Sequence, residues 1–68
     1  MENRIRELRE SFHLTQKELG TLVGVSRQAI NAIETGKYEP SIRLAFRLSK
    51  FFNVTVEELF YFYQEEPK

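Results

Sequence analysis

The segment from Thr15 to Thr35, TQKELGTLVGVSRQAINAIET, constrains the fold most, because it predicts two short amphipathic helices joined by a tight glycine turn. Thr15 is a typical N-cap, and Glu18 three residues later completes a capping box. The apolar residues of this first helix follow at helical spacing: Leu19, Leu22 and Val23. Gly24 then favours a helix end in the left-handed conformation, which only glycine adopts cheaply.

The second helix of this unit has an apolar inner face and a polar outer face. Ser26 is its expected N-cap, and Ile30 and Ile33 are expected to face the core. The residues left pointing away are Arg27, Gln28, Asn31 and Ala32. Arginine and amide side chains at one end of a helix can hydrogen-bond base edges, so the unit is expected to insert this helix into a DNA groove.

Gly20 is unusual in the interior of the first of these helices, where it costs about 1 kcal/mol relative to alanine. A tolerated defect is one interpretation. Because the rest of the pattern is in register, we favour a close contact between the two helices at this position.

Three further helices are expected around this unit. The first spans about residues 3–12, the fourth follows Ser41 and ends at Asn53, and the fifth starts at the capping box of Thr55 and Glu58. Core positions of the fourth helix are Ile42, Leu44, Ala45, Leu48, Phe51 and Phe52. The sequence therefore predicts a single all-α, compact five-helix domain over residues 1–68, with a short extended segment at the C-terminus as one option.

Composition excludes several classes of protein. The chain has no Cys, no Asp and one His, which argues against disulfides, metal sites, cofactors and enzyme chemistry. A chain of 68 residues buries only about 60% of its unfolded surface, so a lone monomer would be marginally stable. With disulfides and metals disfavoured, association with a partner subunit is the remaining source of stability. No signal peptide or run of 18 apolar residues is present, so we expect a cytoplasmic protein that does not enter a membrane.

The net charge is zero, but the charges are unevenly distributed. Residues 1–50 carry nine Lys or Arg against six Glu, a balance of +3, whereas residues 51–68 carry one Lys against four Glu, a balance of −3. Groove binding depends on the local field, so a basic working face is compatible with DNA as the partner.

The C-terminal tail, residues 60–68, begins with four consecutive aromatic residues. Base stacking is disfavoured because acidic neighbours replace the expected basic ones. Burial of Phe60 and Tyr63 in the monomer core is a second option. We favour a homodimer interface, since exposed aromatic patches usually mark one. The expected interface residues are Leu59, Phe60, Tyr61, Phe62 and Tyr63.

The extended string VSRQAINAIETGKYEP, from Val25 to Pro40, resembles the short helix-turn-helix repressors of the phage lambda repressor and Cro class, the xenobiotic-response-element family. The likeness covers about residues 5–60. Two positions differ from the usual pattern: Gly20 replaces a common alanine, and Glu39 replaces a common Asn. The second difference would weaken phosphate contacts from that loop.

The resemblance implies a role for each matching residue. The base-contacting positions are Ser26, Arg27, Gln28, Asn31 and Ala32, and the positions near the DNA backbone are Gln16, Lys17, Thr35, Lys37, Tyr38 and Arg43. Gln28 and Asn31 suit bidentate pairing with adenine, and Arg27 suits guanine or a phosphate. Gln16 would bind a phosphate and brace the first base-reading side chain. Arg9 and Glu34 would form a structural ion pair that orients the reading helix.

These features predict a homodimeric repressor that binds double-stranded DNA at a palindromic operator. Two alternatives stay open. An antitoxin would use the same unit to regulate itself and another surface to bind an unidentified protein partner, and an adaptor would use the fold without DNA.

Overall fold

The computed structural model describes residues 2–60, which form five α-helices. Their bounds are α1 Ile5–Ser11, α2 Gln16–Val23, α3 Arg27–Glu34, α4 Ile42–Phe52 and α5 Val56–Leu59. Each helix falls within a range that the sequence predicts, so the all-α five-helix prediction is confirmed.

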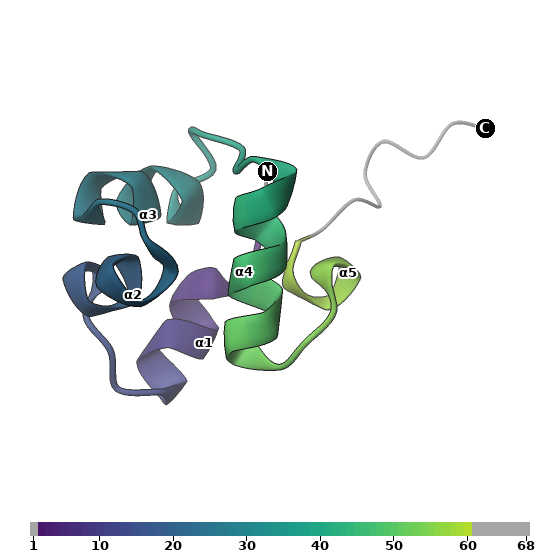
Figure 1. The fold of residues 1–68 in the computed structure, drawn as a ribbon, viewed down its shortest axis with the longest axis horizontal. Helices are drawn as coiled ribbons and strands as arrows, with labels where there is room; N and C mark the ends of the chain where they lie inside the picture. The colour runs from purple at the N-terminus through teal and green to yellow at the C-terminus, as the bar shows by residue number, and fades with distance from the viewer. Residues whose placement is uncertain (1, 61–68) are drawn as a thin grey trace.

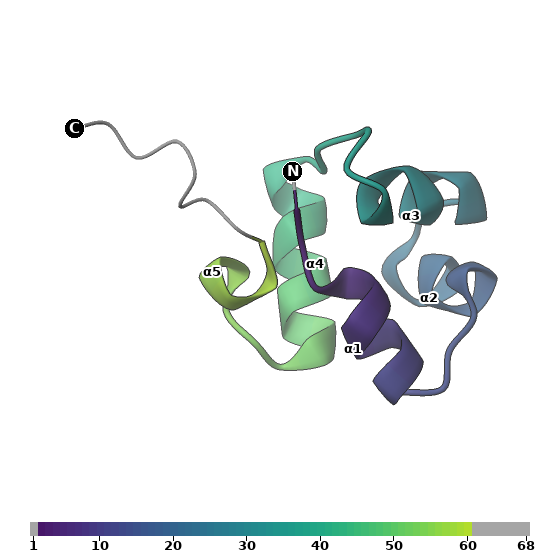
Figure 2. The same ribbon diagram turned by 180° about the vertical axis from the view of Figure 1, so that it is seen from behind.

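Helix α4 lies in the centre of the molecule, with α2 and α3 on one side of it and α5 on the other (Figure 1). The N-terminal segment runs along α4, as the reverse view shows (Figure 2). Helices α2 and α3 pack closely against each other, and both are therefore held as one unit against the rest of the domain.

The predicted helix ends are confirmed in detail. Complete capping boxes at Thr15 and Thr55 open α2 and α5, and a serine hydroxyl accepts a backbone N–H at the start of α3 and of α4. Gly24 adopts φ 87° at the end of α2, and Asn53 adopts φ 60° at the end of α4. These left-handed residues let the chain reverse sharply after each helix.

One apolar core joins all five helices. Its fully buried side chains include Ile5, Leu19, Ile30, Ile33, Leu48, Leu59 and Phe60. The predicted core position Ile42 is wrong, because its side chain is 75% exposed. Leu22, on the predicted apolar face of α2, is also exposed. Helical spacing places both residues beside the apolar stripe, but no other element within residues 2–60 covers that part of α2 or of α4.

Phe60 joins the two ends of the domain. It forms an isolated antiparallel bridge with Asn3, and the backbone N–H of Arg4 donates to the carbonyl oxygen of Leu59 at 2.9 Å. Leu59 and Phe60 are only 0% and 2% exposed. Their assignment to a dimer interface is therefore wrong, because both side chains fill the core of a single chain. Tyr61, Phe62 and Tyr63 lie outside the described residues.

Gly20 makes a close contact, as the sequence suggested, but with the turn that precedes α3 rather than with α3 itself. A Cβ atom at this position would lie 2.5 Å from the backbone oxygen of Val25 and 3.2 Å from that of Ser26. The absence of a side chain thus lets the turn before α3 lie directly on α2.

Within residues 2–60, no helix is long and apolar enough to span a membrane.

Candidate DNA-binding surface

The outer face of α3 carries the polar side chains that the sequence assigned to base reading. Arg27, Gln28 and Asn31 are exposed, and Ala32 is half-buried beside them. Ile30 and Ile33, on the opposite face, are almost fully buried. Because the inner face anchors α3 in the core, the outer face is held in a fixed orientation.

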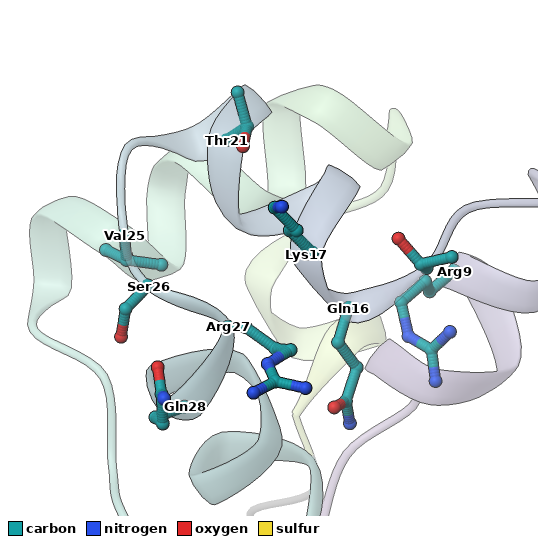
Figure 3. A pocket seen from close by; sticks show the side chains of 9 residues that line it. Arg9, Gln16, Lys17, Thr21, Val25, Ser26, Arg27 and Gln28 are labelled. Atoms are coloured by element: carbon teal, nitrogen blue, oxygen red, sulfur yellow. The ribbon is translucent and has the colours of Figure 1, made fainter.

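An open hollow of about 980 Å³ lies between α2 and the N-terminal end of α3. Gln16 and Lys17 line it from α2, and Arg27 and Gln28 line it from α3 (Figure 3). Gln16, Arg27, Gln28 and Asn31 also line a smaller adjoining hollow. Polar side chains from both helices of the unit therefore meet at one surface.

Ser26 begins α3 as its N-cap. Its hydroxyl oxygen accepts the backbone N–H of Ala29 at 3.1 Å, which leaves its own hydrogen for another partner. The first turn of α3 contains no acidic residue, so the partial positive charge of the helix N-terminus is not neutralised there. This end of α3 is suited to an anionic partner.

Behind this surface lies a buried charge cluster centred on Glu34. The Nε of Arg9 donates to one Glu34 carboxylate oxygen at 2.6 Å, and its Nη2 donates to the other at 3.2 Å. Arg9 also donates to the backbone oxygen of Leu14 at 2.8 Å. The expected ion pair is present, and it ties α1 to the end of α3.

The charge state of Glu34 follows from these contacts. Burial acts to raise the pKa of its carboxyl, but hydrogen bonds from Arg9, Gln16 and Arg6 outweigh burial, so the pKa lies below its ordinary value. The same bond to Glu34 raises the pKa of Arg9. Glu34 is therefore a carboxylate at neutral pH, and all of its partners must be donors.

Gln16 links this cluster to the outer face of α3. Its Nε2 donates to a Glu34 carboxylate oxygen at 3.0 Å and to the Oδ1 of Asn31 at 3.1 Å. The expected bracing role of Gln16 therefore has a structural counterpart, but its partner on α3 is Asn31 in the second turn. Both amide hydrogens of Gln16 are used within the chain.

The candidate backbone-contacting side chains fall into two groups. Lys17, Lys37, Tyr38 and Arg43 are exposed. Thr35, by contrast, donates its hydroxyl hydrogen to the carbonyl oxygens of Asn31 and Ala32 at 3.0 and 3.2 Å. Phosphate oxygens only accept hydrogen bonds, and the side-chain hydrogens of Thr35 and Gln16 are used within the chain in this arrangement. Their phosphate contacts stay a prediction, which requires these hydrogen bonds to be exchanged on binding.

Two arginines with structural roles were missed from the sequence. Arg6 donates from Nε to Glu34 at 3.3 Å, and Arg47 donates to the carbonyl oxygen of Val23 at 3.2 Å near the end of α2. The spacing of three between Arg6 and Arg9 on one helix face signalled the first contact. Only the approach of α4 to α2 reveals the second contact.

Among residues 2–60, no group of three His, Asp or Glu side chains is arranged to hold a metal.

Comparison with known proteins agrees with this geometry. A helix-turn-helix family model matches residues 5–59. An uncharacterized HTH-type transcriptional regulator of Methanocaldococcus jannaschii is 47% identical over 66 residues, which cover 97% of this chain and 100% of that protein. Another from Bacillus subtilis is 43% identical over 65 residues, with coverage of 96% and 98%.

Two solved structures share the fold. The P22 c2 repressor, crystallised in complex with a synthetic operator, has a TM-score of 0.76 and 35% identity, covering 79% of this chain and 82% of that one. The restriction-modification controller protein C.AhdI from Aeromonas hydrophila has a TM-score of 0.75 and 32% identity, with coverage of 84% and 86%. The chain belongs to the helix-turn-helix family of DNA-binding transcriptional regulators with a lambda repressor/Cro-like fold.

Proposed function

We propose that this protein is a sequence-specific regulator that places α3 in the DNA major groove and represses transcription by blocking promoter access. The observation that carries the proposal is the outer face of α3, where Arg27, Gln28 and Asn31 are exposed while the opposite face is locked in the core. The likeness to a repressor crystallised with a synthetic operator supports DNA as the partner.

Base reading is assigned to the outer face of α3 and its cap. The amide of Gln28 makes no hydrogen bond within residues 2–60, so it can pair bidentately with adenine. Arg27 suits guanine or a phosphate, and Ala32 can touch a thymine methyl group. Ser26 keeps its hydroxyl hydrogen for an acceptor on the DNA.

Backbone contacts are assigned to exposed side chains around this helix. Lys17 lies at the start of α2, Lys37 and Tyr38 in the loop after α3, and Arg43 in the first turn of α4. Positive charges in these places would fix the position of α3 without reading sequence. Backbone N–H groups in the first turns of α2 and α4 can add further phosphate contacts.

We also propose a homodimer, with an interface that differs from the one based on Leu59 and Phe60. Ile42 and Phe46 lie one turn apart on α4 and are 75% and 53% exposed. Phe46 and Val56 of α5 line the same hollow. Adjacent exposed apolar side chains are typical of an interface. The proposed interface therefore comprises Ile42, Phe46 and Val56. Tyr61, Phe62 and Tyr63, which lie outside the described residues, stay candidates from the sequence.

Selection of bound sites from a random pool of double-stranded DNA tests the function directly. We expect a near-palindrome with half-sites about 10 base pairs apart, because a two-fold dimer places its recognition helices about 34 Å apart. Failure to enrich any sequence would contradict the proposal.

Two variants, tested on the selected operator, separate base contacts from contacts to the DNA backbone. Gln28→Ala should cost about 1–3 kcal/mol of binding free energy and relax the preference at one base position. Lys37→Ala should weaken binding to all sequences alike and reduce the salt slope by about 1. If Gln28→Ala leaves both affinity and preference unchanged, the assignment of α3 to base reading is wrong.

A further inference from the structure

The side chain of Asn31 is held by Gln16 on the surface that faces away from the core. Asn31 is exposed on α3, and its Oδ1 accepts a hydrogen bond from the Nε2 of Gln16 at 3.1 Å. The same Nε2 donates to a carboxylate oxygen of Glu34 at 3.0 Å. These contacts connect Asn31 to the buried charge cluster through one intervening amide.

The chemistry of Glu34 fixes which atom of each amide faces inward. An ionised carboxylate can only accept hydrogen bonds, so the atom of Gln16 beside it must be the NH2 nitrogen. That nitrogen has two hydrogens, and the second points to Asn31. The atom of Asn31 that receives it must be the oxygen. Asn31 is therefore left with its Nδ2, which carries two donors, for any outside partner.

We propose that Asn31 is a donor-only reading residue that selects guanine over adenine at its base position. The proposal rests on the function proposed above, in which α3 lies in the major groove. Adenine presents one acceptor and one donor there, so bidentate pairing needs both the oxygen and the nitrogen of an amide. Guanine presents two acceptors, N7 and O6, which the Nδ2 group of Asn31 can contact without leaving Gln16.

This inference revises the sequence-based expectation for Asn31 but not the one for Gln28. Both are amides on the same helix, yet only Asn31 has its oxygen engaged by another side chain of the described chain. Cytosine presents a donor in the major groove and would be rejected by Asn31. The two amides of α3 thus have different specificities because their neighbours differ.

The test uses the full-length protein and the operator obtained by site selection. The base read by Asn31 is identified as the position whose preference disappears in Asn31→Ala. Affinities are then measured for operators that carry each of the four bases at that position. We expect the wild type to bind guanine about tenfold more tightly than adenine, within the range of a single base contact.

Gln16→Leu provides the decisive comparison, since it removes the amide and keeps much of the side-chain volume. It frees the oxygen of Asn31 for adenine, so the ratio of guanine to adenine affinity should fall by about tenfold or reverse at this position. The preference at the position read by Gln28 should stay unchanged, and circular dichroism checks that the variant is folded.

Three results would overturn the inference. They are a wild-type preference for adenine at the Asn31 position, an unchanged ratio in folded Gln16→Leu, and no altered position in Asn31→Ala. A wild-type protein that shows no sequence preference at any position would instead contradict the proposed function. Failure of the inference about Asn31 and failure of the proposed function are therefore distinguishable.

Discussion

At the scale of single residues, Glu34 fixes how α3 is held against α1 and α2. Its side chain is 0% exposed and receives hydrogen bonds from Arg9, Arg6 and Gln16. A buried pair of this kind gives little net stability, because the Coulomb attraction mainly offsets desolvation. Its value lies in orientation, since it aligns α1, α2 and the end of α3 at one carboxylate.

Removal of one partner should therefore be costly. We expect Arg9→Met to lower the free energy of unfolding by about 3–5 kcal/mol, because it leaves the buried carboxylate without its main partner. Urea denaturation measures the effect. Arg6→Met is the matched control: this arginine contacts the same carboxylate at 3.3 Å, but its side chain is 56% exposed, so the cost should stay below about 1 kcal/mol. If both variants lose the same free energy of unfolding, the difference in burial between Arg9 and Arg6 has no effect on stability.

Glu34 also predicts a pH dependence of stability. Its pKa is lower in the folded chain than the ordinary value of about 4.3, so the folded state favours the carboxylate. The resulting stability is fully present above the unfolded pKa and is lost as the pH falls through the folded pKa. Urea midpoints between pH 7 and pH 3 should therefore fall more steeply for the wild type than for Glu34→Gln. Parallel curves would contradict the assignment of this titration to Glu34.

At the scale of elements, the contact between α2 and the turn into α3 depends on Gly20. Helix propensity alone predicts that Gly20→Ala stabilises α2 by about 1 kcal/mol. The added Cβ would, however, lie 2.5 Å from the backbone oxygen of Val25, which belongs to a hydrogen-bonded turn and has little freedom to move. Overpacking of this kind costs about 1–3 kcal/mol.

We therefore expect Gly20→Ala to lower the melting temperature. Thr21→Ala, at the next position and exposed, is the matched control and should change the free energy of unfolding by less than about 0.5 kcal/mol. Thermal unfolding followed by circular dichroism compares the two variants. A higher melting temperature for Gly20→Ala would mean that α2 and the turn move apart easily.

At the scale of the whole molecule, the chain beyond α5 divides into a core residue and a tail. Phe60 is buried beside Asn3 and closes the domain. Phe60→Ala should cost about 3–5 kcal/mol, the usual loss for a buried aromatic. Truncation after Phe60 keeps this residue and should leave the stability of the monomer close to that of the full chain, as denaturation of dilute protein would reveal. A large loss of stability on truncation would place the tail in the monomer core.

The proposed dimer interface on α4 and α5 makes a separate prediction. Phe46→Lys introduces a charge at a 53% exposed position of α4 and should convert the dimer into an 8.1 kDa monomer in sedimentation equilibrium. It should also weaken operator binding, because two linked half-sites become independent. Lys50→Ala on the same helix is the control. A wild-type protein that sediments as a monomer, both alone and on a half-site, would contradict the dimer.

Much of this protein was determined by sequence alone, because its signals are local. Capping residues fix where helices begin, and a glycine or asparagine in the left-handed region fixes where α2 and α4 end. The polar outer face of α3 also follows from spacing within one helix. Each of these features depends on residues no more than four positions apart.

Tertiary structure decided the features that depend on distant neighbours. Spacing could not show that Leu22 and Ile42 are exposed, or that Phe60 packs beside Asn3. The amide of Asn31 is a similar case. The oxygen and nitrogen of a free amide can contact either adenine or guanine. The hydrogen bond to Gln16, fifteen residues away, occupies the oxygen of Asn31 and leaves only donors for the base. A side chain's chemistry is set by its residue type, but which of its atoms remain available is set by what folding places beside it.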